Sequence, residues 1–164
     1  MNIDLQFREA MARFPGAVTA ITTAESTVPL GFIATAVCSL SADPPSVIVC
    51  VNKSASAHDV ILHQGFFAVN ILASEHAQVV RQFGEKKGAE RFAGIDWRMG
   101  ETGAPLLTDA RVALDCTLAK AHDGFSHTIL VGVVQSILMP DEANGHCLLW
   151  QGRSFHKAIE LALT

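Results

Sequence analysis

Short runs of apolar and β-branched residues recur along the chain, and Gly, Pro, Asp or Ser bounds them. Such runs are typical of β-strands. The predicted strands cover residues 17–23, 30–41, 47–52, 66–72, 110–123 and 127–139. The run over 110–123 alternates, with one face carrying Val112, Leu114, Cys116 and Leu118. The other face carries Ala113, Asp115, Thr117 and Ala119, and this period of two predicts a strand with one dry face.

Helical periodicity is confined to short segments. Apolar residues follow near-helical spacing over 3–13, and Pro15-Gly16 ends that segment. Further short helices are expected at 57–63, 74–83 and 153–163. Residues 84–109 hold five of the twelve glycines and little periodicity, which predicts a long irregular loop. Strands that mostly follow one another favour an antiparallel barrel over a doubly wound sheet.

Length and composition indicate one domain that spans residues 1–164. With 49% hydrophobic and 17% charged residues, the chain has more apolar surface than a monomer needs, so a homo-oligomer is expected. The net charge is −4 and Lys and Arg form no cluster, which argues against nucleic-acid binding.

The cysteines at 38, 50, 116 and 147 form no C-x-x-C pair and lie in apolar surroundings. They are expected to be buried thiols in a reducing compartment, which points to the cytoplasm. We expect no signal peptide, because the first residues are charged and amphipathic. No apolar run reaches the ~20 residues of a membrane span, so no membrane association is expected.

Several common motifs are absent. The chain lacks G-x-G-x-x-G, the P-loop pattern and G-x-S-x-G, so a nicotinamide nucleotide would visit only as a substrate. There is no H-E-x-x-H, and His58 and His63 stand five residues apart, so they would not share a helix face. No metal site is expected.

A candidate phosphate site lies in "NKSASAHDV", residues 52–60. Ser56 and Asp59 match the capping pattern Ser-x-x-Asp, so Ser56 would begin a helix whose free amides face forward. The hydroxyls of Ser54 and Ser56 and the charge of Lys53 would complete a cradle for a phosphate. Alternatively, Ser56 only caps the helix and Lys53 is solvated.

Hydroxyl and thiol side chains interrupt the two strands that precede this segment. They are Thr35, Cys38, Ser39, Ser41, Ser46, Cys50 and Ser54. A core strand would be expected to avoid so many polar groups, so they are satisfied internally or face a ligand. One elongated ligand with a phosphate tail and a flat polar head would lie across both features. A flavin nucleotide has that shape.

Several blocks, in this order, resemble the short-chain flavin reductases. They are "RFPGAVTAITT", "GFIATAVCSLSADPPSVIVCVNKSASAH", "FAVNIL", "RFAGIDW", "GAPLLTDARVALDC", "SHTILVGVV" and "LLWQGRSFH". The resemblance implies a mainly β fold, an antiparallel FMN-binding split barrel with a few short helices. It also implies a homodimeric flavin reductase that uses FMN or FAD, takes hydride from NADH or NADPH, and supplies reduced flavin to a separate oxygenase.

The resemblance also implies roles for single residues. Those that would line the flavin ring and ribityl chain are Thr35, Ala36, Val37, Cys38, Ser39 and Ser41, with Cys50, Val51 and Asn52 beside them. Those that would receive the phosphate belong to the segment up to His58, namely Lys53, Ser54 and Ser56. Phe83, Arg91 and Phe92 would lie near the flavin.

His127 is expected to act at the nicotinamide site by the same resemblance. The related sequences usually have Gly-Asp-His where this chain has Phe125-Ser126-His127. The missing carboxylate bears on how His127 is oriented. The alternative is that His127 is a hydrogen-bonded histidine at the start of a strand.

Three other functions stay open at this point. A flavoprotein of the same fold would pass electrons to another acceptor, such as a cobalt corrinoid. A binding module would carry flavin or corrin without turnover. An enzyme similar to pyridoxamine-phosphate oxidase would need a basic cluster for its substrate, which the sparse Arg and Lys disfavour.

Overall fold

The computed structural model describes residues 2–140 and 145–162. Its helices are α1 (Ile3–Ala12), α2 (His58–Gln64) and α3 (Ala77–Glu85), with the 3-10 turns η1 (Ser74–His76) and η2 (Gly88–Phe92). The first strands are β1 (Gly16–Ala17), β2 (Thr19–Glu25), β3 (Val28–Ala34), β4 (Val37–Ala42), β5 (Pro45–Asn52) and β6 (Phe66–Ile71). The others are β7 (Trp97–Met99), β8 (Pro105–Leu107), β9 (Val112–Gly124), β10 (His127–Leu138), β11 (Leu148–Gln151) and β12 (Ser154–Lys157).

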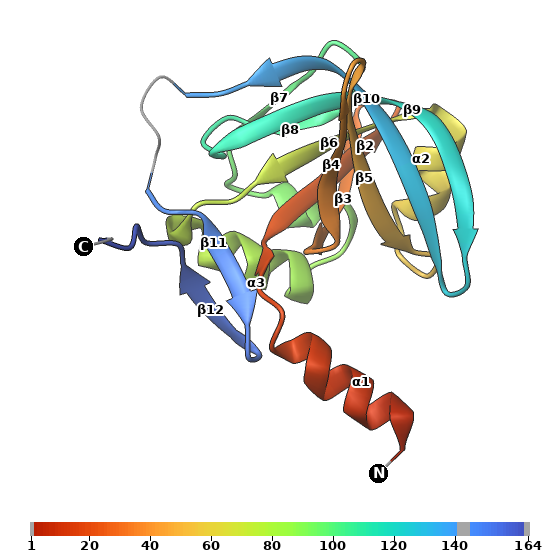
Figure 1. Cartoon of the computed structure of the whole chain (residues 1–164). Coiled ribbons are helices and arrows are strands. Elements are labelled where there is room, and N and C mark those ends of the chain that lie inside the picture. Colours follow the sequence, from red (N-terminus) through yellow and green to blue (C-terminus); the bar gives the residue numbers. More distant parts are fainter. Residues whose placement is uncertain (1, 141–144, 163–164) are drawn as a thin grey trace.

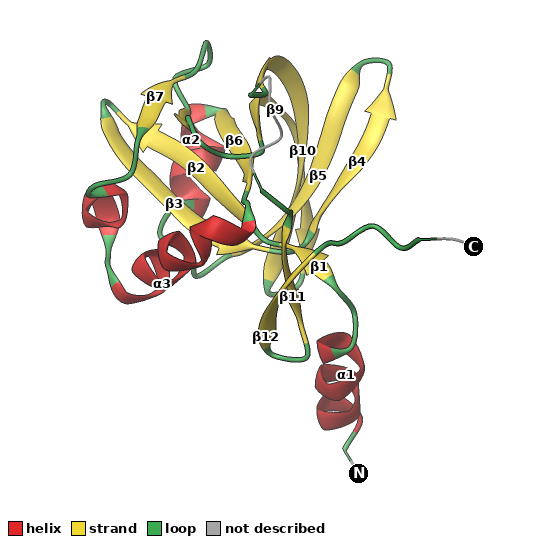
Figure 2. Cartoon of the chain, turned by 90° about the vertical axis from the view of Figure 1, so that its left-hand side faces the viewer, coloured by secondary structure: helices red, strands yellow, loops and turns green. Residues whose placement is uncertain are grey.

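The mainly β fold with a few helices is confirmed. The main sheet is antiparallel, has seven strands in the order β3-β2-β6-β9-β10-β5-β4, and ends at β3 and β4 (Figure 1). A three-stranded sheet β1-β11-β12 and the β7-β8 pair lie beside it. In Figure 2, β2 and β3 lie on one side of the bent sheet and β4 and β5 on the other.

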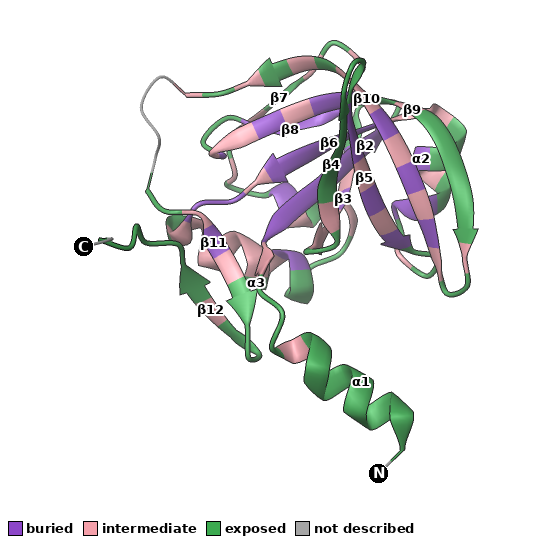
Figure 3. Cartoon of the chain, in the orientation of Figure 1, coloured by how far each residue is buried: buried purple, intermediate pink, exposed green. Residues whose placement is uncertain are grey.

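The main core lies inside the bend of the sheet, where helix α2 covers it (Figure 3). Its largest fully buried side chains include Ile21, Ile61, Phe67 and Leu130. Gly132 in β10 is required by this packing, because a Cβ there would lie 2.5 Å from the Phe67 ring. The absence of a side chain at Gly132 therefore lets the Phe67 ring of β6 pack against β10.

The predicted long loop over 84–109 is only partly irregular. It contains η2, β7 and β8, and it contributes Phe92 and Leu107 to a second core, against which Ile33 of β3 packs. There the ring of Phe92 lies 5.2 Å from Phe83 and 6.0 Å from Trp97 between centroids. These aromatic contacts pack residues 84–109 against helix α3. They depend on the tertiary fold, so the local sequence pattern does not predict them.

Two other predicted elements are wrong. The predicted helix over 153–163 is wrong up to residue 162, and residue 163 lies outside the described residues. Instead, β12 pairs with β11 around a turn at Gly152 and Arg153, where both φ angles are positive. The cross-strand contact of Trp150 with Phe155, at 5.0 Å between ring centroids, supports the hairpin. The predicted strand 30–41 is two strands, separated at Thr35–Ala36.

The prediction of one dry face for β9 holds only in part. Cys116 lies in the main core with Leu114 and Leu118 packed against it, but Asp115 on the opposite face is also fully buried. Its carboxylate accepts hydrogen bonds from the amide of Thr102, at 2.9 Å, and from the hydroxyl of the same residue. The Ser136 hydroxyl donates to Oδ2 of the same carboxylate, at 3.4 Å. The loop before β8 thus covers the face that the alternation leaves to solvent.

The cysteines differ in accessibility more than the sequence predicts. All four thiols are free, but only Cys116 is buried, Cys50 and Cys147 are intermediate, and Cys38 is exposed because β4 is an edge strand. Burial, with a smaller effect of the charge on Asp115, raises the pKa of the Cys116 thiol to about 12. Among the described residues, no helix is long and apolar enough to cross a membrane.

We therefore expect a thiol-specific disulfide reagent to modify Cys38 in the native protein and Cys116 only after unfolding, since thiolate formation controls the reaction. Stopped-flow absorbance of the thiol released from the reagent measures the fast labelling of Cys38 in the native protein and the labelling of Cys116 after unfolding. The variant Cys38→Ser should lack the fast phase. Native labelling of Cys116 at the rate of Cys38 would contradict the burial described here.

Candidate functional site

The two edges of the main sheet define a split in the fold. Strands β3 and β4 are consecutive in the chain and are joined by Thr35–Ala36, yet within residues 2–140 and 145–162 β3 pairs only with β2 and β4 only with β5. The outer edge of β3 therefore keeps backbone groups that no strand pairs. The loop that follows β5 lies across this split from β3.

A cavity of about 420 Å³ occupies this place, and we call it the polar cavity. Lys87 and Arg91 bring positive charge to it, and Ser54 and Ser56 of the loop after β5 line it as well. Its complete lining is Leu30, Phe32, Ser54, Ala55, Ser56, Lys87, Gly88 and Arg91. None of these described lining residues carries a carboxylate, so the cavity is suited to an anion.

Arg91 is held in place by backbone carbonyls. Its Nη1 donates to the carbonyl of Gly31 on β3, at 2.5 Å, and its Nε donates to the carbonyl of Lys86, at 2.9 Å. Gln82 of α3 donates in turn to the Arg91 carbonyl, at 2.9 Å. The guanidinium is thus oriented before any ligand binds, which lowers the entropic cost of binding.

The loop after β5 is organised by Asn52. Its Oδ1 accepts hydrogen bonds from the amide and the hydroxyl of Ser54, both at 2.8 Å. The predicted capping role of Ser56 is wrong, because the N-cap of α2 is Ala57 and no side chain caps the helix. In the part of the chain that the structure describes, the Ser56 hydroxyl has no hydrogen bond and is exposed, so it is available to a ligand.

Lys53 is directed away from the polar cavity. Its ammonium forms an ion pair with Asp123 at the end of β9. This hydrogen bond, together with one from the Phe125 amide, lowers the pKa of the Asp123 carboxyl. His58 is also turned away, since its buried Nε2 lies 2.8 Å from the Thr128 hydroxyl and its Nδ1 lies 2.6 Å from Asp59.

His127 begins β10, opposite Asn52 of β5 in the register of the sheet. Its Nδ1 lies 2.9 Å from the hydroxyl of Ser126. Phe125, in the turn before it, has a φ of 64° and is 93% exposed. The amide of Lys53 donates to the Ser126 carbonyl, at 3.0 Å, so this turn adjoins the loop that lines the polar cavity.

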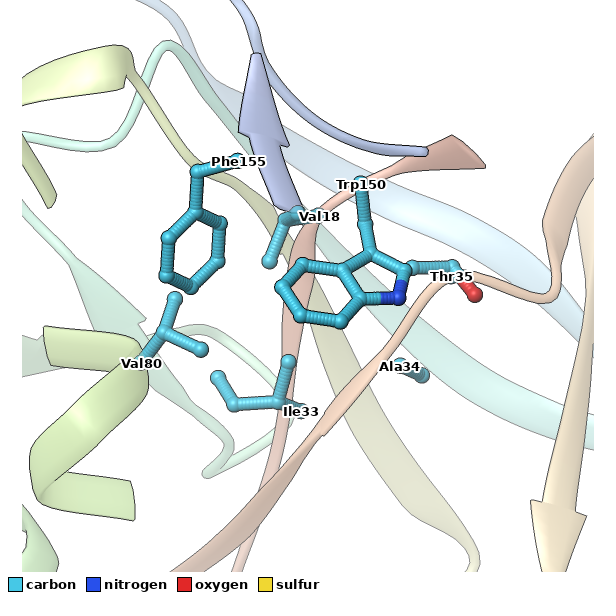
Figure 4. A pocket seen from close by; sticks show the side chains of 7 residues that line it. All are labelled: Val18, Ile33, Ala34, Thr35, Val80, Trp150 and Phe155. Carbon is cyan, nitrogen blue, oxygen red and sulfur yellow. The ribbon is translucent and has the colours of Figure 1, made fainter. Parts of the chain in front are cut away.

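An apolar pocket of about 290 Å³ adjoins the link between β3 and β4 (Figure 4). The rings of Trp150 and Phe155 form one wall, and Ile33 and Val80 face them. Thr35 lies at its rim and brings the only hydroxyl among the residues that line it. The pocket can accept flat apolar groups beside this link.

Comparison with known proteins identifies the family. The model of the flavin reductase like domain matches residues 11–158. The chain belongs to this family.

Individual members of the flavin reductase family agree with this match. The FMN reductase (NADH) RutF of Agrobacterium fabrum is 43% identical over 92% of this chain and 86% of its own length. The nitrilotriacetate monooxygenase component B of Mycobacterium thermoresistibile superposes with a TM-score of 0.89 and 33% identity, over 96% of this chain and 88% of that one. The Streptomyces globisporus NADH:FAD oxidoreductase SgcE6, solved with NAD and FAD fragments, has a TM-score of 0.86 and 31% identity, over 97% and 94%.

Apart from Lys53 and His127, which are described above, the site residues predicted for a flavin reductase fall into three groups. Ser54, Ser56 and Arg91 meet in the polar cavity. Exposed or half-buried positions along the link, β4 and the end of β5 are Thr35, Ala36, Val37, Cys38, Ser39, Ser41, Cys50 and Asn52. Positions in the packed interior, which line neither the polar cavity nor the apolar pocket, are Val51, His58, Phe83 and Phe92.

Sequence reasoning missed Lys87, Leu30 and Phe32, which the fold brings to the polar cavity. Lys87 stands next to Gly88 in a segment without periodicity, so its position depends on how η2 packs against β3. In the sequence, Leu30 and Phe32 are typical apolar residues of a predicted strand. The alternation of β3 was the available signal, because it places them together on one face.

Proposed function

We propose that the chain reduces FMN with NADH and releases the reduced flavin to a separate oxygenase. The observation that carries this proposal is the polar cavity in the split between β3 and the loop after β5. Arg91, Lys87 and Ser56 would hold the phosphate there by charge-assisted hydrogen bonds. Leu30 and Phe32 supply apolar contact beside them.

The residues present fit a flavin nucleotide beyond its phosphate. The link Thr35–Ala36 and the unpaired edge of β3 offer backbone donors and acceptors for a polar ring edge. Exposed Cys38 and Ser39 continue this surface along β4. When bound, the flavin accepts a hydride from the nicotinamide, so the protein need only bind, align and exclude water. No nucleophile or carboxylate pair is needed for that role.

FMN and NADH are the proposed pair, with FAD and NADPH as the alternatives. The two cations in the polar cavity match the charge of one phosphate monoester, and RutF of Agrobacterium fabrum carries both FMN and NADH in its name. SgcE6 is named for FAD, which supports FAD as the alternative flavin. His127 would contact the nicotinamide, in keeping with its place beside Asn52.

The oxygenase is proposed as the acceptor because a related structure is component B of a monooxygenase. Transfer to a cobalt corrinoid and flavin carriage without turnover are the alternatives, and one assay tests the reductase proposal against the carrier. The purified protein is mixed with FMN or FAD and with NADH or NADPH, and the nicotinamide absorbance is followed. If no pair gives oxidation above background, the reductase proposal is refuted. A protein that is yellow from tightly bound flavin and is bleached by neither nicotinamide favours flavin carriage without turnover.

We also propose a cytoplasmic homodimer formed by one domain over residues 1–164. Helix α1 projects from the rest of the chain and buries none of its residues (Figure 1). Ile3, Phe7 and Phe14 are 71%, 62% and 70% exposed, and so short a helix is marginal without packing. A second copy would cover these side chains. Light scattering should give twice the mass of the chain, and a monomer at micromolar concentration would refute the dimer.

A further inference from the structure

We propose that Ser126 is a positioning residue that fixes the ring orientation and tautomer of His127. This inference rests on the proposed function, in which His127 contacts the nicotinamide. It assigns a role to the hydroxyl of the residue that directly precedes His127.

The first support is the contact itself. The Ser126 hydroxyl lies 2.9 Å from Nδ1 of His127, within hydrogen-bond distance. A hydroxyl that donates to Nδ1 leaves the ring proton on Nε2, because a neutral imidazole carries one proton. His127 then presents an N–H donor, which suits the carboxamide oxygen of a nicotinamide.

The second support is that Ser126 is itself anchored to the phosphate-binding side of the site. Its carbonyl accepts a hydrogen bond from the Lys53 amide, at 3.0 Å. The ion pair of Lys53 with Asp123 closes the same turn from the other strand. Ser54, next to Lys53, lines the polar cavity. One residue therefore ties His127 to the loop that would hold the flavin phosphate.

The chemistry differs from that of a carboxylate in this position. A carboxylate beside Nδ1 would stabilise the imidazolium, whereas a hydroxyl orients the ring without favouring its charged form. Other titratable groups on the strands that flank His127 are Lys53 after β5 and Asp123 and His122 in β9. Lys53 and Asp123 pair with each other. The Ser126 hydroxyl therefore orients His127 without placing a charge beside its ring.

The test uses the full chain with four substitutions, Ser126→Ala, Ser126→Thr, Ser126→Asp and His127→Ala. Loss of one hydrogen bond is expected to raise the KM for NADH about five- to tenfold in Ser126→Ala, with kcat and FMN affinity little changed. Ser126→Thr keeps the hydroxyl and should retain the KM. In Ser126→Asp the carboxylate can only accept from Nδ1, which draws the ring proton to Nδ1, so the KM should rise as in Ser126→Ala.

A readout without turnover separates this inference from the proposed function. The nitrogen-15 chemical shifts of His127, measured on the folded protein alone, should show the proton on Nε2 in the wild type and a tautomer mixture in Ser126→Ala. An unchanged tautomer together with an unchanged KM in Ser126→Ala would overturn the role of Ser126. If the wild type oxidises no NADH, or if His127→Ala leaves the KM unchanged, the nicotinamide role fails, and the nitrogen shifts alone decide the positioning role.

Discussion

Replacing Arg91 with alanine is expected to weaken FMN binding between about tenfold and a hundredfold while riboflavin binding changes by less than about twofold. Arg91 is half-buried, lines the polar cavity, and is oriented by the carbonyls of Gly31 and Lys86. A hydrogen bond from such a guanidinium to a phosphate is among the strongest that a side chain makes. Riboflavin has the ring but not the phosphate, so it reports damage to the rest of the site.

Fluorescence titration of the flavin measures both affinities. Lys87→Ala should weaken FMN binding in the same direction but less, because Lys87 is exposed and its ammonium is more mobile. The matched control is Arg81→Ala, since Arg81 is an exposed arginine of α3 that lines neither the polar cavity nor the apolar pocket. Equal losses for FMN and riboflavin in Arg91→Ala would show that the polar cavity is not the phosphate site.

Most of the strands follow from the sequence, because β-branched runs and turn residues determine them locally. Residues 66–72 and 127–139 match β6 and β10 closely. The hairpin of β11 and β12 does not follow, since its stability depends on the contact of Trp150 with Phe155 rather than on a periodic pattern. The burial of Asp115 likewise depends on Thr102, which a distant loop brings to it.

The candidate site divides in the same way. The serines after β5 are adjacent in the chain, so their grouping is visible in the sequence. Lys87 reaches the same cavity from a segment more than thirty residues later, and only the packing of η2 against β3 places it there. Lys53 shows the opposite case, because it is adjacent to Ser54 but pairs with Asp123 across the hairpin. Adjacency in the chain predicts a shared loop, but not the direction of each side chain.

Substituting Asn70 with alanine is expected to lower the free energy of unfolding by about 3 kcal/mol. Asn70 of β6 is fully buried, and its Nδ2 donates to the Ala20 carbonyl and the Thr22 hydroxyl, both at 3.0 Å. Its Oδ1 accepts from the amide of Leu107, at 2.8 Å. Truncation leaves that buried amide without a partner and opens a cavity between β2, β6 and β8.

Urea unfolding at a fixed protein concentration measures the loss as a lower midpoint at an unchanged slope. The control is Gln135→Ala, which removes an amide from an exposed side chain of β10 and should cost less than about 0.5 kcal/mol. Asn70→Asp keeps the shape but sets a carboxylate oxygen against the Ala20 carbonyl. Burial should raise the pKa of this carboxyl, so the variant should regain stability as the pH falls and the group is protonated. If both Asn70 variants unfold at the wild-type midpoint, the amide network does not hold β8 against the sheet, and the apolar contacts of Leu106 and Leu107 must do so instead.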